Sequence, residues 1–310
     1  MIIDVHAYWD PARMPLEEMD RQIHRHGLEC VVLSPPCTER FEPDKSPFMY
    51  AAQRFLLRND LLRPIAELSA RSFYDDQGHL RPVWRLFTRS GQPINKVTAP
   101  DNTGLLGAIA PYESMHAWYW LNPGTVLFWK QILRESAHHR VVGFKLHAYW
   151  HSFTVEQAEK VFFIAEETRR PLYLILGFGW LEGAIRFLEK FPSVDVIFGY
   201  GGFPYFDRLC RRIKPFKNAW VDLTSNHLEE RTIADLVKIL GPDRILYGSD
   251  CPYNFPDSKG NFDYSKTMDR IRGLHLDPQA EERILWRNAQ NLLFERRSSR
   301  TRGSVEEALR

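Results

Sequence analysis

The sequence has 310 residues, of which 44% are hydrophobic and 26% charged, a balance typical of soluble globular proteins. Its 41 basic and 39 acidic residues leave a net charge of +2, which excludes the strong basic field of a nucleic-acid-binding protein. The first residues lack the pattern of a signal peptide, and no run of about 18 apolar residues is present, so we expect a cytoplasmic protein without a membrane span.

Eight short apolar runs recur along the chain and indicate strands that are buried on both faces. They lie at residues 1–5, 30–33, 105–110, 141–146, 171–176, 194–198, 219–223 and 244–247. Helical patterns lie between them, including a capping-box pattern at Thr154 and Gln157 and amphipathic stretches at 181–191, 206–213 and 228–240. Alternating strands and helices predict an α/β fold, and eight strands predict a (β/α)₈ barrel of the TIM type.

The connection between the second and third predicted strands is unusually long. It contains an insertion at about 44–104, with helical stretches at 49–57 and 59–72. We interpret the insertion as a helical lid over the C-terminal face of the barrel, the alternative being an ordinary crossover with an extra helix. The barrel is expected to occupy residues 1–295 as a single domain. The charged tail at 296–310 is either a frayed end or a short docking helix.

Recognisable residues lie at the ends of three predicted strands. Asp4-Val-His-Ala-Tyr8 ends the first, Val142-Gly-Phe-Lys-Leu-His147 ends the fourth, and Gly248-Ser-Asp-Cys-Pro252 follows the eighth. A helical segment that contains Asn288 comes after them. Together these motifs resemble the amidohydrolase-related family of metal-dependent hydrolases and decarboxylases, including the aminocarboxymuconate-semialdehyde decarboxylase-like enzymes. The resemblance extends to about Phe294, and it implies an active site at the C-terminal mouth of the barrel.

The departures from the family pattern fall on the metal ligands. The family has Asp-x-His-x-His on the first strand, where this chain has Tyr8 at the second histidine position. The histidine expected after the fifth strand is replaced by Ile175 or Leu176, and the sixth strand has Gly199 in place of histidine. We therefore predict a site without a metal cofactor. The alternative is a single zinc ion bound by His6, His147 and Asp250, with an open fourth position.

Two residues of the family pattern remain and are the first catalytic candidates. Asp250 follows a buried strand, where it acts as a general base or, in the simpler reading, accepts backbone hydrogen bonds in a loop. His6 shares a strand face with Asp4 and Tyr8 and is expected to face Asp250 across the mouth. This His–Asp pair is a proton shuttle, half of a metal site or a contact that only closes the barrel.

A second row with period 2 lies on the fourth predicted strand and contains Lys145, His147 and Tyr149. Lys145 is a candidate to hold a substrate carboxylate, and His147 is a candidate to replace a lost ligand. The alternative is that Lys145 pairs with a barrel carboxylate, Asp222 or Asp4.

Aromatic residues follow six of the predicted strands. We expect the ligand to contact seven side chains at the mouth: Tyr8, Trp118, Tyr149, His151, Trp180, Tyr200 and Tyr253. Such a lining favours an apolar or aromatic small molecule, with hydroxyl and indole N–H groups as orienting donors. The alternative is that the aromatic rings pack against the insertion and plug the mouth. The cysteines at 30, 37, 210 and 251 show no paired spacing and are expected to be reduced thiols.

These residues predict a hydrolase or lyase of the amidohydrolase type. Asp250 would be the general base, while His6 and Lys145 would polarise a carbonyl group or hold a carboxylate. Esters, lactones, thioesters or aromatic acids are the expected substrates, because hydrolysis of amides depends more on a metal Lewis acid.

A non-catalytic ligand-binding or partner protein on a barrel that has lost its activity is the main alternative, and a homo-oligomer is compatible with the sequence. Convergence of His6, Lys145, His147 and Asp250 on an open cavity would favour the enzyme. Filling of that space by Tyr8 and Tyr200 would favour the non-catalytic protein.

Overall fold

The computed structural model describes residues 1–36, 99–151, 153–224, 228–253 and 262–295, and between 37 and 98 only residues 55–56, 61–62 and 65. The predicted helices at 49–57 and 59–72, most of the insertion at 44–104 and the tail at 296–310 lie outside these residues. The predicted lid, the domain bounds and the role of the tail therefore stay predictions.

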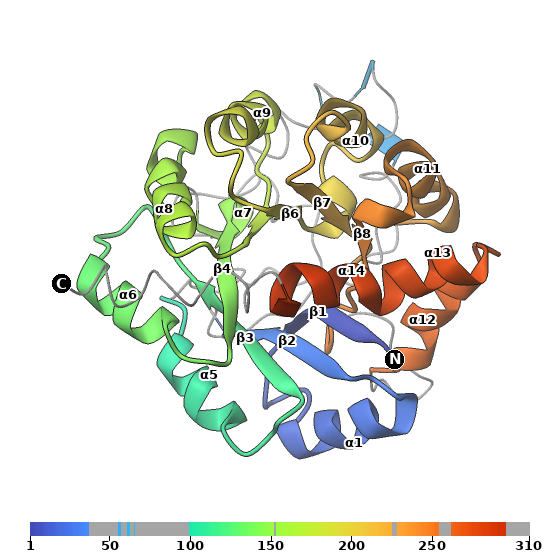
Figure 1. The fold of residues 1–310 in the computed structure, drawn as a ribbon, viewed down its shortest axis with the longest axis horizontal. Coiled ribbons are helices and arrows are strands. Elements are labelled where there is room, and N and C mark those ends of the chain that lie inside the picture. Colours follow the sequence, from blue (N-terminus) through green and yellow to red (C-terminus); the bar gives the residue numbers. More distant parts are fainter. Residues whose placement is uncertain are drawn as a thin grey trace, which may run out of the picture.

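The described residues form eight parallel strands in a single sheet, ordered β1 to β8 along the chain. The strands are β1 (Ile3–Tyr8), β2 (Cys30–Ser34), β3 (Met115–Trp120), β4 (Val141–His147), β5 (Leu172–Ile175), β6 (Val196–Phe198), β7 (Ala219–Asp222) and β8 (Ile245–Leu246). The sheet closes where Val5 N donates to Tyr247 O at 3.0 Å and Ala7 pairs with Cys251. The predicted TIM-type barrel is confirmed (Figure 1).

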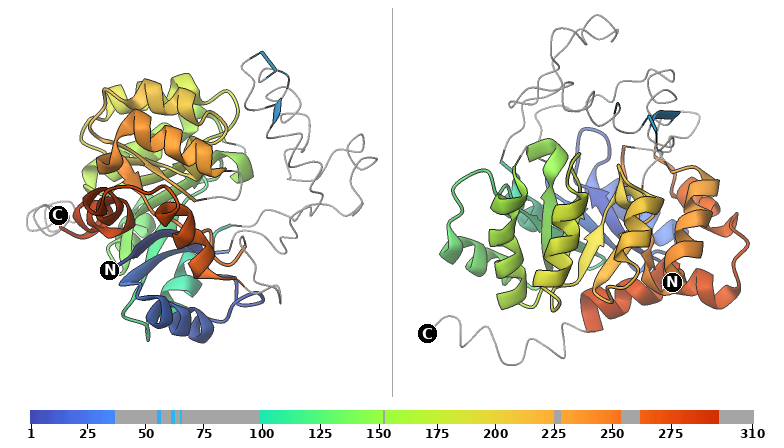
Figure 2. Two further views of the ribbon diagram at one scale, coloured as in Figure 1. Left: turned by 90° about the vertical axis from the view of Figure 1, so that its right-hand side faces the viewer. Right: turned by 90° about the horizontal axis from the view of Figure 1, so that it is seen from above.

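Helices surround this sheet on its outer side (Figures 1 and 2). They are α1 (Leu16–His26), α5 (Asn102–Ile109), α6 (Trp129–Ser136), α8 (Val155–Glu167), α9 (Leu181–Lys190), α10 (Asp207–Ile213), α11 (Glu230–Leu240) and α12 (Tyr264–Arg272), whereas the short α7 (Ala148–His151) directly follows β4. The predicted capping box of α8 is confirmed, since Gln157 N donates to Thr154 Oγ1 at 3.2 Å and Thr154 N donates to Gln157 Oε1 at 2.8 Å. None of the helices in the described ranges has the length and apolar character needed to cross a membrane.

The last helical segment closes the end of the barrel opposite the predicted mouth. It comprises α13 (Pro278–Glu282), Arg283–Arg287, α14 (Asn288–Gln290) and Asn291–Glu295. The Asn288 amide donates to Pro242 O at 2.7 Å and to Ile245 O at 2.8 Å, which ties the segment to the start of β8. Leu292 and Leu293 are buried in the interior core. The family motif around Asn288 thus has a structural role, and the polar side chains concentrate at the C-terminal ends of the strands.

The prediction of a third strand at residues 105–110 was wrong. Residues 105–110 belong to α5 and the short turn after it, and Asp101 caps this helix by accepting from Gly104 N at 2.9 Å. The unbroken apolar run did not distinguish a strand from a buried helix, and only Leu105 and Ile109, four residues apart on one helix face, are buried. The true third strand is β3, so that Trp118 and Trp120 lie on a strand and not in a loop after one.

A register shift in β1 changes which side chains enter the barrel. β1 and β2 pair at Asp4 and at Ala7, with an irregularity between these two positions. Beyond it, the His6 side chain points into the barrel, whereas the Asp4 carboxylate accepts from the hydroxyl of Tyr264 in the outer helix α12 at 3.2 Å. The prediction that Asp4 and His6 share one face was therefore wrong, because a bulge interrupts the period of 2.

Candidate functional site

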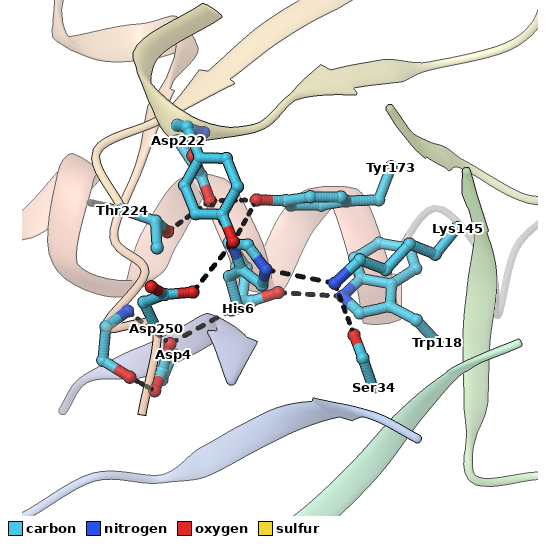
Figure 3. A network of polar contacts seen from close by, with 12 residues as sticks. Asp4, His6, Ser34, Trp118, Lys145, Tyr173, Asp222, Thr224 and Asp250 are labelled. Carbon is cyan, nitrogen blue, oxygen red and sulfur yellow. Dashed lines mark hydrogen bonds and ion pairs between the residues drawn. The ribbon is translucent and has the colours of Figure 1, made fainter. Parts of the chain in front are cut away.

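His6 lies at the centre of a polar network inside the barrel (Figure 3). Its Nε2 is 3.1 Å from Lys145 Nζ on β4, and its Nδ1 is 2.5 Å from the hydroxyl oxygen of Tyr173 on β5. Asp222, at the end of β7, places Oδ2 at 3.3 Å from the same Nδ1. All four side chains are fully buried, so their polar atoms must satisfy one another.

The hydrogen bonds define the protonation state of His6. The Tyr173 hydroxyl donates to Asp222, so its oxygen can accept from His6 Nδ1–H. Nε2 then keeps its lone pair and accepts from the Lys145 ammonium group. Burial, with the nearby positive charge of Lys145, lowers the pKa of His6 to about 4, and Asp222 opposes this shift. His6 is therefore a neutral imidazole with an assigned tautomer at neutral pH.

Asp222 anchors the inner side of this network. Besides the Tyr173 hydroxyl, its carboxylate accepts from Tyr200 N at 2.7 Å and from the hydroxyl of Thr224. A buried carboxylate with three donors from β5 and from the segments after β6 and β7 fixes these elements relative to one another. It also holds Tyr173 in the orientation that His6 requires.

The Lys145 ammonium group is enclosed by aromatic rings. It lies 4.1 Å from the ring centroid of Tyr8, 4.7 Å from that of Trp120 and 5.3 Å from that of Tyr173. It donates to Ser34 Oγ at 2.7 Å as well as to His6. Cation–π contacts and hydrogen bonds together stabilise the charged form of a buried lysine. Lys145 points into the barrel interior, where its hydrogen bonds to His6 and Ser34 hold the ammonium group in place.

Asp250 lies on the segment after β8, beside His6 of β1, and its side chain contacts Tyr200. Tyr200 Oη donates to Asp250 Oδ1 at 3.0 Å, and the hydroxyl oxygens of Tyr8 and Tyr200 are 3.2 Å apart. Asp250 has φ +62°, a left-handed conformation that aspartate tolerates better than most residues. Burial raises the pKa of Asp250 to about 7, against the opposing effects of the Tyr200 hydrogen bond and the Lys145 charge.

The predicted side-chain pair of His6 and Asp250 is not formed. The His6 ring contacts Lys145, Tyr173 and Asp222, and Asp250 reaches His6 only through its backbone N–H, which donates to His6 O at 2.8 Å. The rings of Tyr8 and Tyr200 lie 5.2 and 5.0 Å from the His6 ring. The carboxylate partner of His6 comes from β7, and the Asp250 carboxylate accepts from Tyr200.

The structure brings together most of the predicted aromatic residues. Tyr253 packs edge-on against Tyr8 with ring centroids 5.3 Å apart, and Tyr200 is half-buried beside them. His147 stacks on Trp120 at 5.9 Å, and His151 lies 5.4 Å from the same indole. Burial, followed by the positive charge of Lys145, lowers the pKa of His147 well below its usual value. These residues form a continuous aromatic lining at the ends of β1, β3 and β4.

Three predicted ligand contacts have other positions. Trp118 is fully buried in the interior core, where its Nε1 donates to Val5 O at 2.8 Å. Trp180 precedes α9 and packs edge-on against Phe153, 5.3 Å between ring centroids. Tyr149 belongs to α7 and not to a row on β4, which ends at His147, and its side chain lies outside the described residues.

The sequence interpretation missed Tyr173, Ser34 and Thr224 and underrated Trp120 and Asp222. Tyr173 is the register partner of Lys145 in the pairing of β4 with β5. This pairing could have identified Tyr173 from the sequence, because residues opposite each other in a sheet share a face. Once Lys145 is placed inside the barrel, Tyr173 must follow it.

The residues around His6 do not fit a divalent metal ion. A lysine ammonium group, which is not a metal ligand, contacts Nε2 at 3.1 Å. A Cβ atom at Gly199 would lie 2.7 Å from the Tyr173 hydroxyl, so that Tyr173 fills the space where a histidine on the sixth strand would begin. Within the part of the chain that the structure describes, no three His, Cys, Asp or Glu side chains gather as a ligand set. The metal-free site nevertheless stays a prediction, and so does the alternative zinc site.

The comparisons with known proteins agree with this architecture. A family model described as amidohydrolase matches residues 113–294. No curated protein matches the sequence. A probable 2-pyrone-4,6-dicarboxylic acid hydrolase from Acinetobacter baumannii, with citric acid bound, is 13% identical with a TM-score of 0.61, covering 94% of this chain and 98% of that one.

Two further solved structures contain metal ions. An amidohydrolase from Burkholderia multivorans with bound zinc is 10% identical with a TM-score of 0.58, over 94% of this chain and 99% of that one. A dihydroxybenzoic acid decarboxylase from a Polaromonas species, with manganese and the inhibitor 2-nitroresorcinol, is 14% identical with a TM-score of 0.55, over 94% and 96%. At such low identity these likenesses establish the shared fold.

Proposed function

Because the chain belongs to the amidohydrolase family, we propose that it is a hydrolase or lyase of small carbonyl compounds that works without a metal ion. The proposed substrates are esters, lactones, thioesters or aromatic acids. Asp250 is the general base, and the Lys145 charge stabilises negative charge on the substrate. Family membership supports the coarse assignment to an enzyme of this class, and the residues at the mouth support the finer one.

The observation that carries the proposal is the chain of hydroxyl and carboxyl groups at the mouth. Asp250 contacts Tyr200 at 3.0 Å, and Tyr200 contacts Tyr8 at 3.2 Å. This row of hydrogen-bonded groups ends at Tyr8, and the Lys145 ammonium nitrogen lies 4.1 Å from the centroid of the Tyr8 ring. It joins a titratable carboxyl group, two proton-donating hydroxyl groups and a fixed positive charge, which are the parts that acid–base catalysis requires.

The buried environment tunes Asp250 for proton transfer near neutral pH. With a pKa of about 7, the carboxylate form is available and is also basic enough to take a proton from an attacking water or from the substrate. The Tyr200 hydroxyl that donates to Oδ1 holds the carboxylate in place. The negative charge that develops on the substrate oxygen lies in the field of Lys145, whose burial preserves the strength of that field.

The lining favours a flat substrate that carries an acidic group. Tyr8, Trp120 and Tyr253 present ring faces and edges at the same end of the barrel. Two of the similar structures contain citric acid and 2-nitroresorcinol, one a carboxylic acid and the other an aromatic phenol. These ligands belong to those proteins, and they support the choice of small acids as the first compounds to test here.

A second candidate function rests on the positions of Tyr8 and Tyr200. Their rings cover His6 at 5.2 and 5.0 Å, and Tyr8 is only 7% exposed. This packing favours the non-catalytic ligand-binding protein, because the imidazole has no direct route to a substrate while both rings stay in place. In the proposed enzyme, His6 therefore positions Lys145 and Tyr173 and does not contact the substrate.

A substrate screen in the presence of a chelator separates the two candidates. The purified protein is tested with EDTA against aryl esters, lactones and hydroxylated aromatic acids, by absorbance and by carbon dioxide release. Turnover that survives EDTA and disappears in Asp250→Asn supports the proposed enzyme. Ligands that raise the melting temperature without being turned over favour the binding protein, and turnover that requires added zinc or manganese contradicts the metal-free mechanism.

A further inference from the structure

Two tryptophans of β3 point into the barrel, but only one has its indole N–H satisfied. Trp118 Nε1 donates to Val5 O at 2.8 Å. Trp120 is 1% exposed, and among the described residues the structure gives its Nε1 no hydrogen-bond acceptor. An unsatisfied buried N–H destabilises a protein by about 1–3 kcal/mol, so a donor of this kind is expected to meet an acceptor in the working molecule.

The backbone holds Trp120 firmly in place. Asn102, in the first turn of α5, accepts from Trp120 N at 2.8 Å and donates to Trp120 O at 2.9 Å. This bidentate contact fixes the indole at the C-terminal end of β3. A donor on a rigid element is suited to orient a ligand, because little conformational entropy is lost on binding.

The surroundings of the indole select the charge of the acceptor. The Lys145 ammonium group lies 4.7 Å from the Trp120 ring centroid, and the imidazoles of His147 and His151 flank the ring at 5.9 and 5.4 Å. The charged group over the indole ring is therefore the Lys145 ammonium group. A negatively charged oxygen gains from both the N–H group and this charge, whereas a neutral oxygen gains mainly from the N–H group.

We propose that Trp120 Nε1 and Lys145 form a carboxylate subsite, in which a substrate carboxylate oxygen accepts the indole N–H beside the ammonium group. The subsite specifies the substrate class of the proposed enzyme, and the choice of an aromatic acid rests on that proposed function. It makes Trp120 a specificity-determining residue. The aromatic ring of the acid then lies against Tyr8 and Tyr253, on the side where Asp250 and Tyr200 meet.

The test compares two substitutions of indole by phenyl on the same strand. Binding of benzoate and of benzyl alcohol, its neutral counterpart, is measured by isothermal titration calorimetry with the parent protein, Trp120→Phe and Trp118→Phe. We expect the parent to prefer benzoate, and Trp120→Phe to weaken benzoate binding about ten-fold and benzyl alcohol binding by less, because the hydrogen bond to a charged oxygen is the stronger one. Trp118→Phe, which loses only an internal hydrogen bond, should lower the melting temperature and keep the benzoate affinity.

Each outcome either supports the subsite or overturns it. Equal benzoate affinity in the parent and Trp120→Phe overturns it, as does a parent that binds neither probe. A raised melting temperature in Trp120→Phe with unchanged benzoate affinity would show that the buried N–H only destabilises the fold and binds no ligand, and would also overturn it. Because calorimetry needs no turnover, a selective loss in Trp120→Phe supports the subsite even if no reaction is found and the proposed enzyme fails.

Discussion

Asp4 and Asp250 are two buried carboxyl groups beside the seam where the barrel closes, and they differ in what surrounds them. Burial raises the pKa of each to about 7. Asp4 accepts from Ser249 N at 3.0 Å, from the Ser249 hydroxyl and from Tyr264 in the outer helix α12. Asp250 accepts from Tyr200 at the mouth of the barrel.

Two carboxyl groups with the same raised pKa can thus have different roles, and a shifted pKa does not identify a catalytic group by itself. All these donors to Asp4 belong to the segment that carries Ser249 and to the outer helix α12, so the Asp4 carboxylate holds these two elements together. Asp250 accepts from the Tyr200 hydroxyl, which in the proposed enzyme exchanges protons with the substrate. Geometry separates a structural carboxylate from a working one where the pKa alone does not.

The largest expected effect is a difference in kcat between variants of the two carboxyl groups. Asp250→Asn should reduce kcat by about two to four orders of magnitude, the usual contribution of a general base, while binding and fold are kept. Asparagine tolerates the left-handed conformation at this position, so the backbone is not strained. Asp4→Asn is the matched control and should keep most of the turnover. Equal losses of kcat in both variants would break the comparison.

The pH dependence of turnover follows from the pKa of Asp250. A base with a pKa of about 7 is protonated below that pH, so kcat/KM should fall about ten-fold per pH unit on the acidic side and level off above pH 7. The measurement is kcat/KM from pH 5 to pH 9 for whichever substrate the screen identifies. A profile that is flat between pH 5 and pH 8 would assign the proton transfer to another group.

Stability should respond more strongly at Asp4. Asp4→Asn replaces an acceptor of Ser249 and Tyr264 by an amide that cannot satisfy all of these donors, so we expect a loss of about 1–3 kcal/mol in the free energy of unfolding. Chemical denaturation at pH 4 measures this loss, because the raised pKa leaves Asp4 protonated in the folded protein and no ionisation penalty is present. An Asp4→Asn protein as stable as the parent would contradict the structural role given to this carboxylate.

Gly199 tests whether Tyr173 has taken the space of a lost histidine. Gly199 has φ −71°, which any residue can adopt, but a Cβ there would lie 2.7 Å from the Tyr173 hydroxyl. We expect Gly199→Ala to destabilise the protein by about 1–3 kcal/mol by displacing Tyr173 from His6 and Asp222. Gly107→Ala is the control, since a Cβ at Gly107 meets nothing within 4 Å and alanine favours its helix. Equal free energies of unfolding of the two variants would show that the Tyr173 side chain moves aside at little energetic cost.

The last stability test is the pH dependence of the stability difference between Asp250→Asn and the parent. The folded-state pKa of Asp250 is raised from 3.8 to about 7, so its contribution is fully present below pH 3.8 and is lost as the pH rises through 7. Asparagine does not titrate. The melting temperature of Asp250→Asn relative to the parent should therefore increase from pH 4 to pH 7, and a constant difference would contradict the raised pKa.

Sequence periodicity predicted much of the barrel and part of the site. Seven of the eight predicted strands overlap strands of the structure, and Lys145 and His147 lie on one strand with the predicted spacing of 2. The predicted strand at 105–110 failed because an apolar run without alternation suits a buried helix equally well.

Non-local features account for what was missed at the site. The bulge after Asp4 moves His6 to the opposite parity, and a period of 2 cannot reveal it. Tyr173 and Asp222 contact His6 across 167 and 216 positions of sequence, and only the closed barrel brings them together.

The proposed site works with the Lys145 charge and without a bound metal, and metal analysis tests this most directly. Purified protein, prepared without chelators and dialysed, is analysed for zinc and manganese by inductively coupled plasma mass spectrometry. We predict well under one ion per chain, and the same content in His6→Ala. One equivalent of metal that survives dialysis and is lost in His6→Ala would contradict the account and favour the zinc site built from His6, His147 and Asp250.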